Sequence, residues 1–358
     1  MALFTPSRAC VFTAAHELAD EIVVGCTSAR TAEKASPNSA SHSYDDMAES
    51  SDDDDDFAVA LDADGRVAGS SGVCDPQFAC WDSLLRCHDL AALRVDCELA
   101  SWPLAASSFW LPCDAAPQNA LESLAAAIFR LHTRGRDFDR AASGAEWWAN
   151  VSRSEAMARA DGYGKVYMHF DKDERAYSEC GLFVHPLAST VTYLTSEGAP
   201  TLVVDARLSP EGKYVEAVGD AHIVPPRVGR HVRFDGRLLH GAPLELLEAR
   251  GDESPYVRVT FLVNIWIGHR PRGCARYKPP HSAVAISRTP VRLRAAAATT
   301  AARRVSEHAS GGGEIHRFAV AQTDEARELR LPVAFAASAA ARRGQVVRLG
   351  GCELRRPG

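Results

Sequence analysis

The chain has 358 residues, of which 46% are hydrophobic and 24% are charged. This balance is typical of a globular protein with one sizeable core and attached segments. The formal net charge of -6 gives no electrostatic reason to expect nucleic acid or an anionic membrane as a partner, which argues against the class of polyanion-binding proteins.

The N-terminal segment, residues 1–56, contains a strongly acidic stretch. Residues 27–56 are rich in Ser, Ala and Asp, and eight acidic but no basic residues lie between Asp45 and Asp56. Because such a run of like charges repels itself and cannot form a packed core, we predict a disordered acidic linker.

Membrane and secretory features are not expected. Glu17, Asp20 and Glu21 interrupt the N-terminal apolar residues, and no stretch reaches the roughly 18 consecutive apolar residues of a membrane span. The ten cysteines include no C-x-x-C pair and predict reduced, mostly buried thiols. We therefore expect a cytoplasmic protein without a membrane partner, and the sequence leaves its oligomeric state open.

Residues 57–160 are expected to form a helical region that supports the core. From Gln118 onward, apolar residues recur at the spacing of one helix face. A second, short helix is expected over Glu146 to Met157, with Trp147 and Trp148 as packing groups. Both helices should cover one side of a sheet. The apolar positions of the first helix are Ala120, Leu121, Leu124, Ala127, Ile128 and Leu131.

Residues 161–280 show a period of two, which indicates strands. Short alternating segments are separated by Gly, Pro and Ser clusters, as in an all-β sandwich or barrel. Together with the helices, this predicts a mainly β fold with flanking helices (α+β). The segments are Lys165 to Asp171, Thr190 to Thr195, Thr201 to Asp205, His231 to Phe234 and Tyr256 to Ile267.

Residues 281–358 form a C-terminal appendage rich in Ala and Arg. We expect it to be partly ordered, with strands near Phe318 and Val346.

Two of the predicted strands carry a coherent polar face, because side chains two apart in a strand point the same way. Tyr167, His169 and Asp171 share one face of the first strand. On the last strand, Arg258 and Thr260 share a face with Leu262, Asn264 and Trp266, and the alternate positions from Val259 to Ile267 form an apolar back.

His169, Asp171 and His240 together make a two-histidine, one-carboxylate set. Such a set holds iron(II) on one face and leaves positions open for substrate and oxygen. His240 follows a hydrophobic strand and precedes Gly241, which allows close backbone approach. The other histidines considered, His185, His222, His231 and His269, belong to no H-x-D or H-x-E pair and are left outside the site, and residues 173–175 are expected to form a solvated turn.

With these motifs the chain resembles the 2-oxoglutarate and iron(II)-dependent dioxygenase superfamily, particularly its prolyl hydroxylase-like branch. The resemblance covers roughly residues 163–271 and implies a double-stranded β-helix, or jelly roll. The motifs that carry it are His169-Phe170-Asp171, Thr192-Tyr193-Leu194, Gly198-Ala199-Pro200-Thr201, His240-Gly241 and Arg258-Val259-Thr260.

The resemblance implies a role for each matching residue. His169, Asp171 and His240 would bind iron(II), and Arg258 would pair its planar fork with the distal carboxylate of 2-oxoglutarate. Thr260 matches the hydroxyl residue two positions beyond that arginine. Tyr193 resembles a tyrosine whose hydroxyl reaches the same carboxylate, and a core tyrosine with a satisfied hydroxyl is the alternative.

The sequence departs from the family pattern in two places. The gap from His240 to Arg258 is longer than usual, so Arg250 competes for the co-substrate role; Arg258 is preferred because it lies on a strand and is followed by Thr260. Ala199-Pro200-Thr201 also replaces the family's usual residues at one turn.

The activity implied is an Fe(II)- and 2-oxoglutarate-dependent oxygenase that hydroxylates or oxidatively demethylates a small-molecule or peptide substrate, releasing succinate and CO2. Ascorbate is an optional stimulant of turnover. Because Asp171 is retained, oxygenation is expected in place of halogenation. The alternatives are a cupin-like metalloenzyme that does not use 2-oxoglutarate, and a catalytically silent jelly roll that acts in binding.

Overall fold

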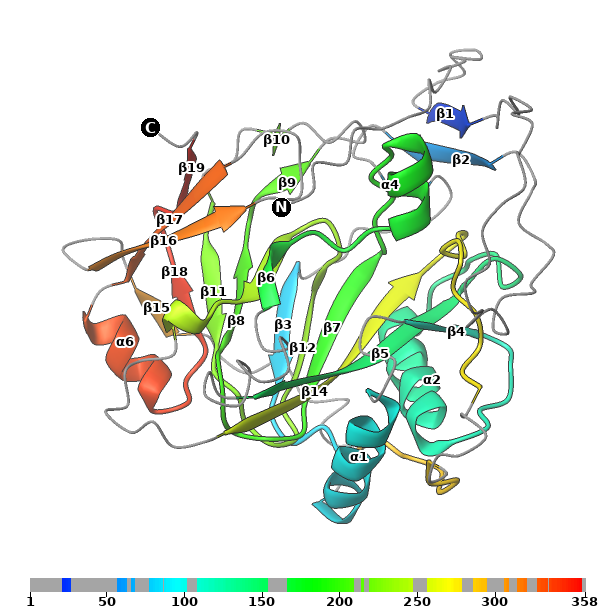
Figure 1. Ribbon diagram of the computed structural model, residues 1–358, viewed down its shortest axis with the longest axis horizontal. Helices are drawn as coiled ribbons and strands as arrows, with labels where there is room; N and C mark the ends of the chain where they lie inside the picture. The colour runs from blue at the N-terminus through cyan, green and yellow to red at the C-terminus, as the bar shows by residue number, and fades with distance from the viewer. Residues whose placement is uncertain are drawn as a thin grey trace, which may run out of the picture.

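The described part of the chain consists mostly of antiparallel strands with a few helices in this computed structural model (Figure 1). The predicted acidic linker, residues 27–56, lies outside the described residues. These are residues 21–26, 57–62, 66–67, 77–85, 87–101, 108–153, 166–208, 214–215, 219–246, 256–278, 286–294, 306–308, 314–320, 327–333 and 335–355.

The first large sheet has six antiparallel strands in the order β3-β12-β7-β14-β5-β4. Strand β14 is central: it pairs with β5 from Val257 opposite Arg153 to Trp266 opposite Gly144, and with β7 on its other side. The strands are β3 (Phe78–Trp81), β4 (Phe109–Pro112), β5 (Gly144–Arg153), β7 (Ala188–Tyr193), β12 (His231–Asp235) and β14 (Val257–Trp266).

The second sheet has nine strands in the order β15-β18-β11-β8-β13-β6-β16-β17-β19. Its four middle strands, β11 to β6 in this order, are antiparallel. The strands are β6 (Val166–His169), β8 (Thr201–Val204), β11 (Ala221–Val224), β13 (Leu239–Ala242), β15 (Ser306–His308), β16 (Glu314–Val320), β17 (Arg327–Val333), β18 (Val347–Leu349) and β19 (Glu353–Arg355).

The C-terminal region extends the second sheet at both ends. Strand β16 continues beyond β6, and β18 pairs with β11. The strands predicted near Phe318 and Val346 are therefore confirmed. Two small sheets complete the described strands: β1 (Glu21–Cys26) with β2 (Phe57–Asp62), and β9 (Arg207–Leu208) with β10 (Tyr214–Val215).

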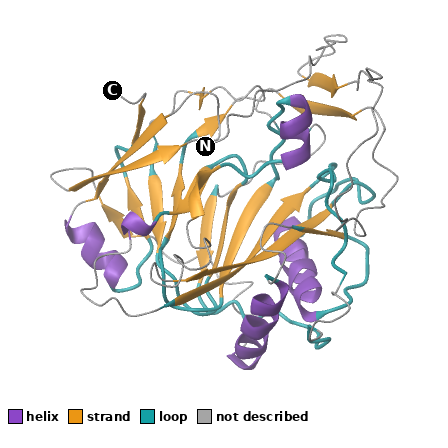
Figure 2. Cartoon of the chain, viewed as in Figure 1, coloured by secondary structure: helices purple, strands orange, loops and turns teal. Residues whose placement is uncertain are grey.

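Two helices, α1 (Cys87–Ala100) and α2 (Ala120–Thr133), lie against β5 and β14 of the six-stranded sheet (Figure 2). The helix predicted from Gln118 is thus confirmed, and its N-cap Asn119 accepts a hydrogen bond from the Glu122 backbone N–H at 2.9 Å. The other helices within the described ranges are α4 (Glu174–Cys180), α6 (Phe335–Arg342) and the short 3-10 helix η1 (Leu244–Leu246). None of the helices in the described ranges is both long and apolar enough to cross a membrane.

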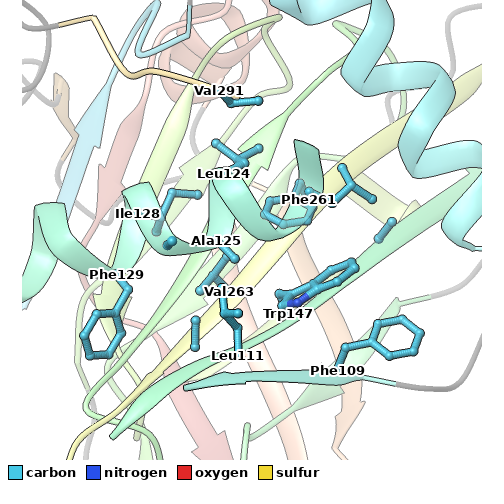
Figure 3. Close-up of a cluster of buried hydrophobic side chains, with 14 of the residues drawn as sticks. Phe109, Leu111, Leu124, Ala125, Ile128, Phe129, Trp147, Phe261, Val263 and Val291 are labelled. Atoms are coloured by element: carbon cyan, nitrogen blue, oxygen red, sulfur yellow. The ribbon is translucent and has the colours of Figure 1, made fainter. Parts of the chain in front are cut away.

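The apolar back of β14 forms the core beneath these helices (Figure 3). Phe261 and Val263 are fully buried and belong to one cluster with Leu124 and Ile128 of α2 and Trp147 of β5. The predicted alternation on β14 is therefore confirmed, and the face that carries Arg258 points away from the helices. A second cluster combines side chains of both large sheets, so that the two sheets face each other; it contains Cys80, Val191, Tyr193, Val203, Val224, Val232, Phe234, Leu238 and Val346.

The helix predicted over Glu146 to Met157 is wrong, because residues 144–153 form strand β5. Trp147 is fully buried toward the helices, whereas Glu146 lies on the opposite face beside Asn264 and Trp266. Pairing with β14 along the whole strand outweighs the local helical preference, as tertiary context commonly does. Region 57–160, expected to be helical, therefore contributes three strands to the six-stranded sheet as well as two helices.

The chain order of the strands brings distant motifs together. With the β9–β10 pair set aside, eight successive strands run along the chain from β5 to β14. In one sheet β5, β14, β7 and β12, which are the first, eighth, third and sixth of them, lie side by side in this order. In the other sheet β6, β13, β8 and β11, which are the second, seventh, fourth and fifth, lie side by side. The second and seventh, β6 and β13, carry His169 and His240 and are direct neighbours.

A buried histidine connects β12 to α2 and provides a test of acid stability. His231 lies 2.8 Å from His132, Nε2 to Nε2, and its Nδ1 lies 2.8 Å from the Thr192 hydroxyl. Burial, followed by the charge of Arg233, lowers the pKa of His231 to about 3. The unfolded chain would bind a proton here near its ordinary pKa of 6.5. Stability is therefore lost as pH falls from about 6.5 toward 3.

We expect His231 to contribute about 1.4 kcal/mol per pH unit to that loss. Urea unfolding at pH 7 and pH 5 measures it, with His231→Gln beside the wild type. The variant should show a shallower pH dependence. An unchanged slope would mean that His231 does not stay neutral in the folded protein.

Candidate metal and co-substrate site

The register between β6 and β13 positions the two candidate metal ligands. His169, at the end of β6, is the direct partner of His240 on β13, and Asp171 follows His169 by two residues. The ring centroids of His169 and His240 are 4.3 Å apart. Within the described ranges, these three residues form the one group of three or more His, Cys, Asp or Glu residues whose ligand atoms all lie within 4.8 Å of one another.

The ligand atoms converge at separations that suit one metal ion. The Asp171 carboxylate lies between the rings, with Oδ2 3.3 Å from His240 Nε2 and Oδ1 3.7 Å from His169 Nε2. Adjacent ligands on a metal with bonds of about 2.1 Å lie about 3 Å apart. A small movement of these side chains toward a bound ion would therefore bring all three ligand atoms within bonding distance of it.

Backbone contacts orient both imidazoles for metal binding. Nδ1 of His169 lies 2.7 Å from the Tyr167 carbonyl, and Nδ1 of His240 lies 2.9 Å from the Leu238 carbonyl. Each Nδ1 therefore carries the donating hydrogen, which leaves the Nε2 lone pair for a metal. The Ser189 hydroxyl donates to Asp171 Oδ2 at 2.6 Å and holds the carboxylate.

The charge states suit a cation that displaces one proton. Burial lowers the pKa of His240, but the charge and hydrogen bond of Asp171 outweigh it and raise that pKa, so in the metal-free site Nε2 of His240 holds a proton toward Asp171 that a bound metal would replace. Burial and the neighbouring charge of His240 lower the pKa of His169 to about 4, so that its ring is neutral at pH 7. Burial raises the pKa of Asp171, but the charges and hydrogen bonds of His240, His169 and Ser189 outweigh it and hold that pKa well below its usual range. Asp171 is therefore a carboxylate, and the donor set fits a divalent metal.

Arg258 lies on the inner face of β14 and is 96% buried. Its Nε donates to the Ala199 carbonyl at 3.0 Å, and its Nη2 to the Thr201 hydroxyl at 3.1 Å. In the part of the chain that the structure describes, no carboxylate pairs with this guanidinium. A buried cation without a counterion is costly, so the site is suited to an anion from outside.

The other predicted co-substrate residues surround Arg258. The Thr260 hydroxyl lies 3.4 Å from Arg258 Nη1, and the guanidinium lies over the Tyr193 ring at 5.4 Å from its centroid. The Tyr193 hydroxyl lies 2.5 Å from the Thr201 hydroxyl and donates to the Val224 carbonyl at 3.0 Å. The competing Arg250 lies outside the described residues.

Because Gly198 has no side chain, the Arg258 side chain can pack directly against it. It has a φ of 90°, and a Cβ added there would lie 2.6 Å from the Arg258 Cβ. Gly198→Ala should therefore combine backbone strain with displacement of Arg258, costing about 1 to 3 kcal/mol of stability and weakening the predicted binding of 2-oxoglutarate. Gly135 is the matched control, because it has a φ of 77° with open space around it.

Gly135→Ala should lose stability through strain alone and leave co-substrate binding unchanged. Thermal unfolding and 2-oxoglutarate titration separate the two effects. Equal co-substrate affinity in both variants would show that Gly198 does not shape the Arg258 site.

Two residues of this region were not anticipated by the motifs. Ser189 holds Asp171. It lies one residue before the predicted strand Thr190 to Thr195, and the observed strand β7 includes it. Asp173, expected in a solvated turn, is instead fully buried as the N-cap of α4, where it accepts from the backbone N–H groups of Arg175 and Ala176 and lies 2.9 Å from His269 Nε2. It fixes the chain just after the candidate ligands.

No protein-family model matches the chain, and no curated protein matches it. Solved structures with partial similarity include a prolyl-4-hydroxylase from Pseudomonas putida, 15% identical, covering 54% of this chain and 89% of that chain at a TM-score of 0.31. EctD from S. alaskensis is 16% identical, covering 60% and 84% at 0.31. HygX from Streptomyces hygroscopicus, with nickel and 2-oxoglutarate bound, is 8% identical, covering 61% and 93% at 0.29. Similarity of this size establishes no shared activity.

Proposed function

We propose that this chain is an Fe(II)- and 2-oxoglutarate-dependent oxygenase that hydroxylates or oxidatively demethylates a small-molecule or peptide substrate, with release of succinate and CO2. One observation carries the proposal: His169, Asp171 and His240 converge, and both His240, beside Phe234, and the buried Arg258, over Tyr193, adjoin the cluster that lies between the two sheets. A metal-binding group and a carboxylate-binding group near each other are the two requirements of this chemistry.

The strand order supports a double-stranded β-helix, or jelly roll, as the fold. Eight strands divided between two facing sheets, with chain neighbours alternating between them, are the arrangement of a jelly roll. In such a fold the open end between the sheets holds the ligands. Both candidate histidines lie on neighbouring strands of the same sheet, His169 as the last residue of β6 and His240 near the start of β13.

The chain's own residues would divide the work as follows. His169, Asp171 and His240 would hold iron(II), which supplies open coordination positions for the keto acid and for dioxygen. Arg258 would bind the distal carboxylate of 2-oxoglutarate through its planar fork, aided by the hydroxyls of Thr260 and Thr201. The Tyr193 ring would help to hold the Arg258 guanidinium in place through a cation–π contact.

The test is succinate formation by the purified protein. Iron(II) and 2-oxoglutarate are added together and singly, with and without ascorbate, under air. We expect slow succinate release that requires both components even before a substrate is known, and ascorbate should sustain it. Tight binding of iron without any succinate would favour a cupin-like metalloenzyme, and the absence of both would favour a silent jelly roll used in binding.

A further inference from the structure

A row of polar side chains begins at the candidate metal ligand Asp171 and crosses three neighbouring strands of the six-stranded sheet. Ser189 on β7, Asn264 on β14 and Glu146 on β5 are direct partners in the strand register. Ser189 donates to Asp171, and Asn264 Nδ2 lies 3.4 Å from Glu146 Oε2. We call Asp171, Ser189, Asn264 and Glu146 the polar row.

Glu146 is a buried carboxylate whose partners are all neutral. It accepts from the Ser108 hydroxyl at 2.6 Å and from Trp266 Nε1 at 2.9 Å, besides Asn264. Burial raises its pKa, and Asp171 is the charged residue that raises it further. Among the described residues, no Lys, Arg or His forms an ion pair with Glu146, so an ionised Glu146 would need a cation beside it.

Asn264, beside Glu146, carries a buried hydrogen-bond acceptor without a partner. Asn264 is 3% exposed, and its Oδ1 is buried without a hydrogen-bond partner in the described structure. A buried acceptor of this kind costs about 1 to 3 kcal/mol when it stays unpaired. The amide nitrogen faces Glu146, so the oxygen is available to a donor that enters beside the carboxylate.

We propose that Glu146 and Asn264 form a subsite for a cationic nitrogen of the substrate, such as a primary ammonium group. The inference rests on the proposed function. Iron(II) and Arg258 together would balance the charges of Asp171 and of 2-oxoglutarate, so an ionised Glu146 would be the one group of the polar row that still needs a cation. An ammonium group would neutralise Glu146 and donate to Asn264 Oδ1 at once.

The subsite would also fix the position of the substrate relative to the metal ligands. The polar row spans β7, β14 and β5, and neighbouring strands lie about 4.8 Å apart. A substrate whose nitrogen lies at Glu146 would therefore extend along the row toward Asp171. Its reacting carbon would be separated from that nitrogen by several bonds.

The test compares three probes of equal chain length and different charge: butylammonium, n-butanol and butyrate. Each is titrated by NMR into protein loaded with Zn(II), which is redox-inert, and 2-oxoglutarate. We expect butylammonium to bind the wild type about tenfold more tightly than n-butanol, and Glu146→Gln to abolish this preference. Glu98→Gln, which removes an exposed carboxylate on α1, is the matched control and should behave as the wild type.

Asn264→Ala is a second variant, which keeps Glu146 and removes the unpaired acceptor. It should weaken butylammonium binding several-fold. If Glu146→Gln does not fold, this variant tests the subsite in its place. Equal binding of the three probes to the wild type, or a cation preference that survives in the folded variants, would overturn the subsite. Zinc and 2-oxoglutarate titrations are recorded first. Failure at that stage counts against the proposed function, whereas loss of the cation preference alone does not.

Discussion

His240→Ala should lower iron(II) affinity at least about 100-fold and remove succinate formation. Even removal of a residue that only orients a metal ligand commonly costs 10- to 100-fold in affinity, so loss of a ligand itself should cost more. The change takes away the Nε2 that lies 3.3 Å from Asp171 and breaks the facing pair with His169. Metal titration and succinate release measure the two effects on one sample.

A histidine outside the site is the control for this change. His316 on β16 is half-buried and lies outside the group of candidate ligands. His316→Ala should bind iron(II) and form succinate as the wild type does. If His240→Ala kept full affinity while it remained folded, the assignment of the metal ligands would be wrong.

Arg258→Lys should raise the KM for 2-oxoglutarate about 100-fold and change kcat much less. Lysine keeps the positive charge but cannot make two parallel hydrogen bonds to one carboxylate, and it loses the contacts to Ala199 and Thr201. Disrupting a buried, hydrogen-bonded charge pair typically costs 2 to about 5 kcal/mol. Steady-state succinate formation at varied 2-oxoglutarate gives both constants.

Arg270→Lys is the matched control, because Arg270 is exposed in the segment after β14. It should leave both constants unchanged. An Arg258→Lys enzyme with the wild-type KM would direct attention to Arg250 as the co-substrate anchor.

The sequence predicted the strands that carry the site because their alternation is strong. On β14, the alternate residues from Val259 to Ile265 face the helices, whereas Arg258, Thr260 and Asn264 lie on the opposite face, and this parity follows from the two-residue period alone. His169 and Asp171 could be paired from their spacing. Their approach to His240 could not, because it depends on the long-range register of β6 and β13.

Strand β5 shows why the remainder was not predictable. Residues 146–153 have no strict alternation of apolar and polar types, since both faces of the strand are partly buried between helices and the opposite sheet. A helix was therefore predicted there, and Glu146 was assigned no role. Its place beside Asn264 follows from pairing with β14, which local sequence does not encode.

The most direct test of the account is the anomalous diffraction of crystals grown with iron(II) in the absence of oxygen. We expect one iron peak at about 2.1 Å from His169 Nε2, His240 Nε2 and an Asp171 carboxylate oxygen. An iron ion bound elsewhere, or coordinated by fewer than these three side chains, would contradict the account.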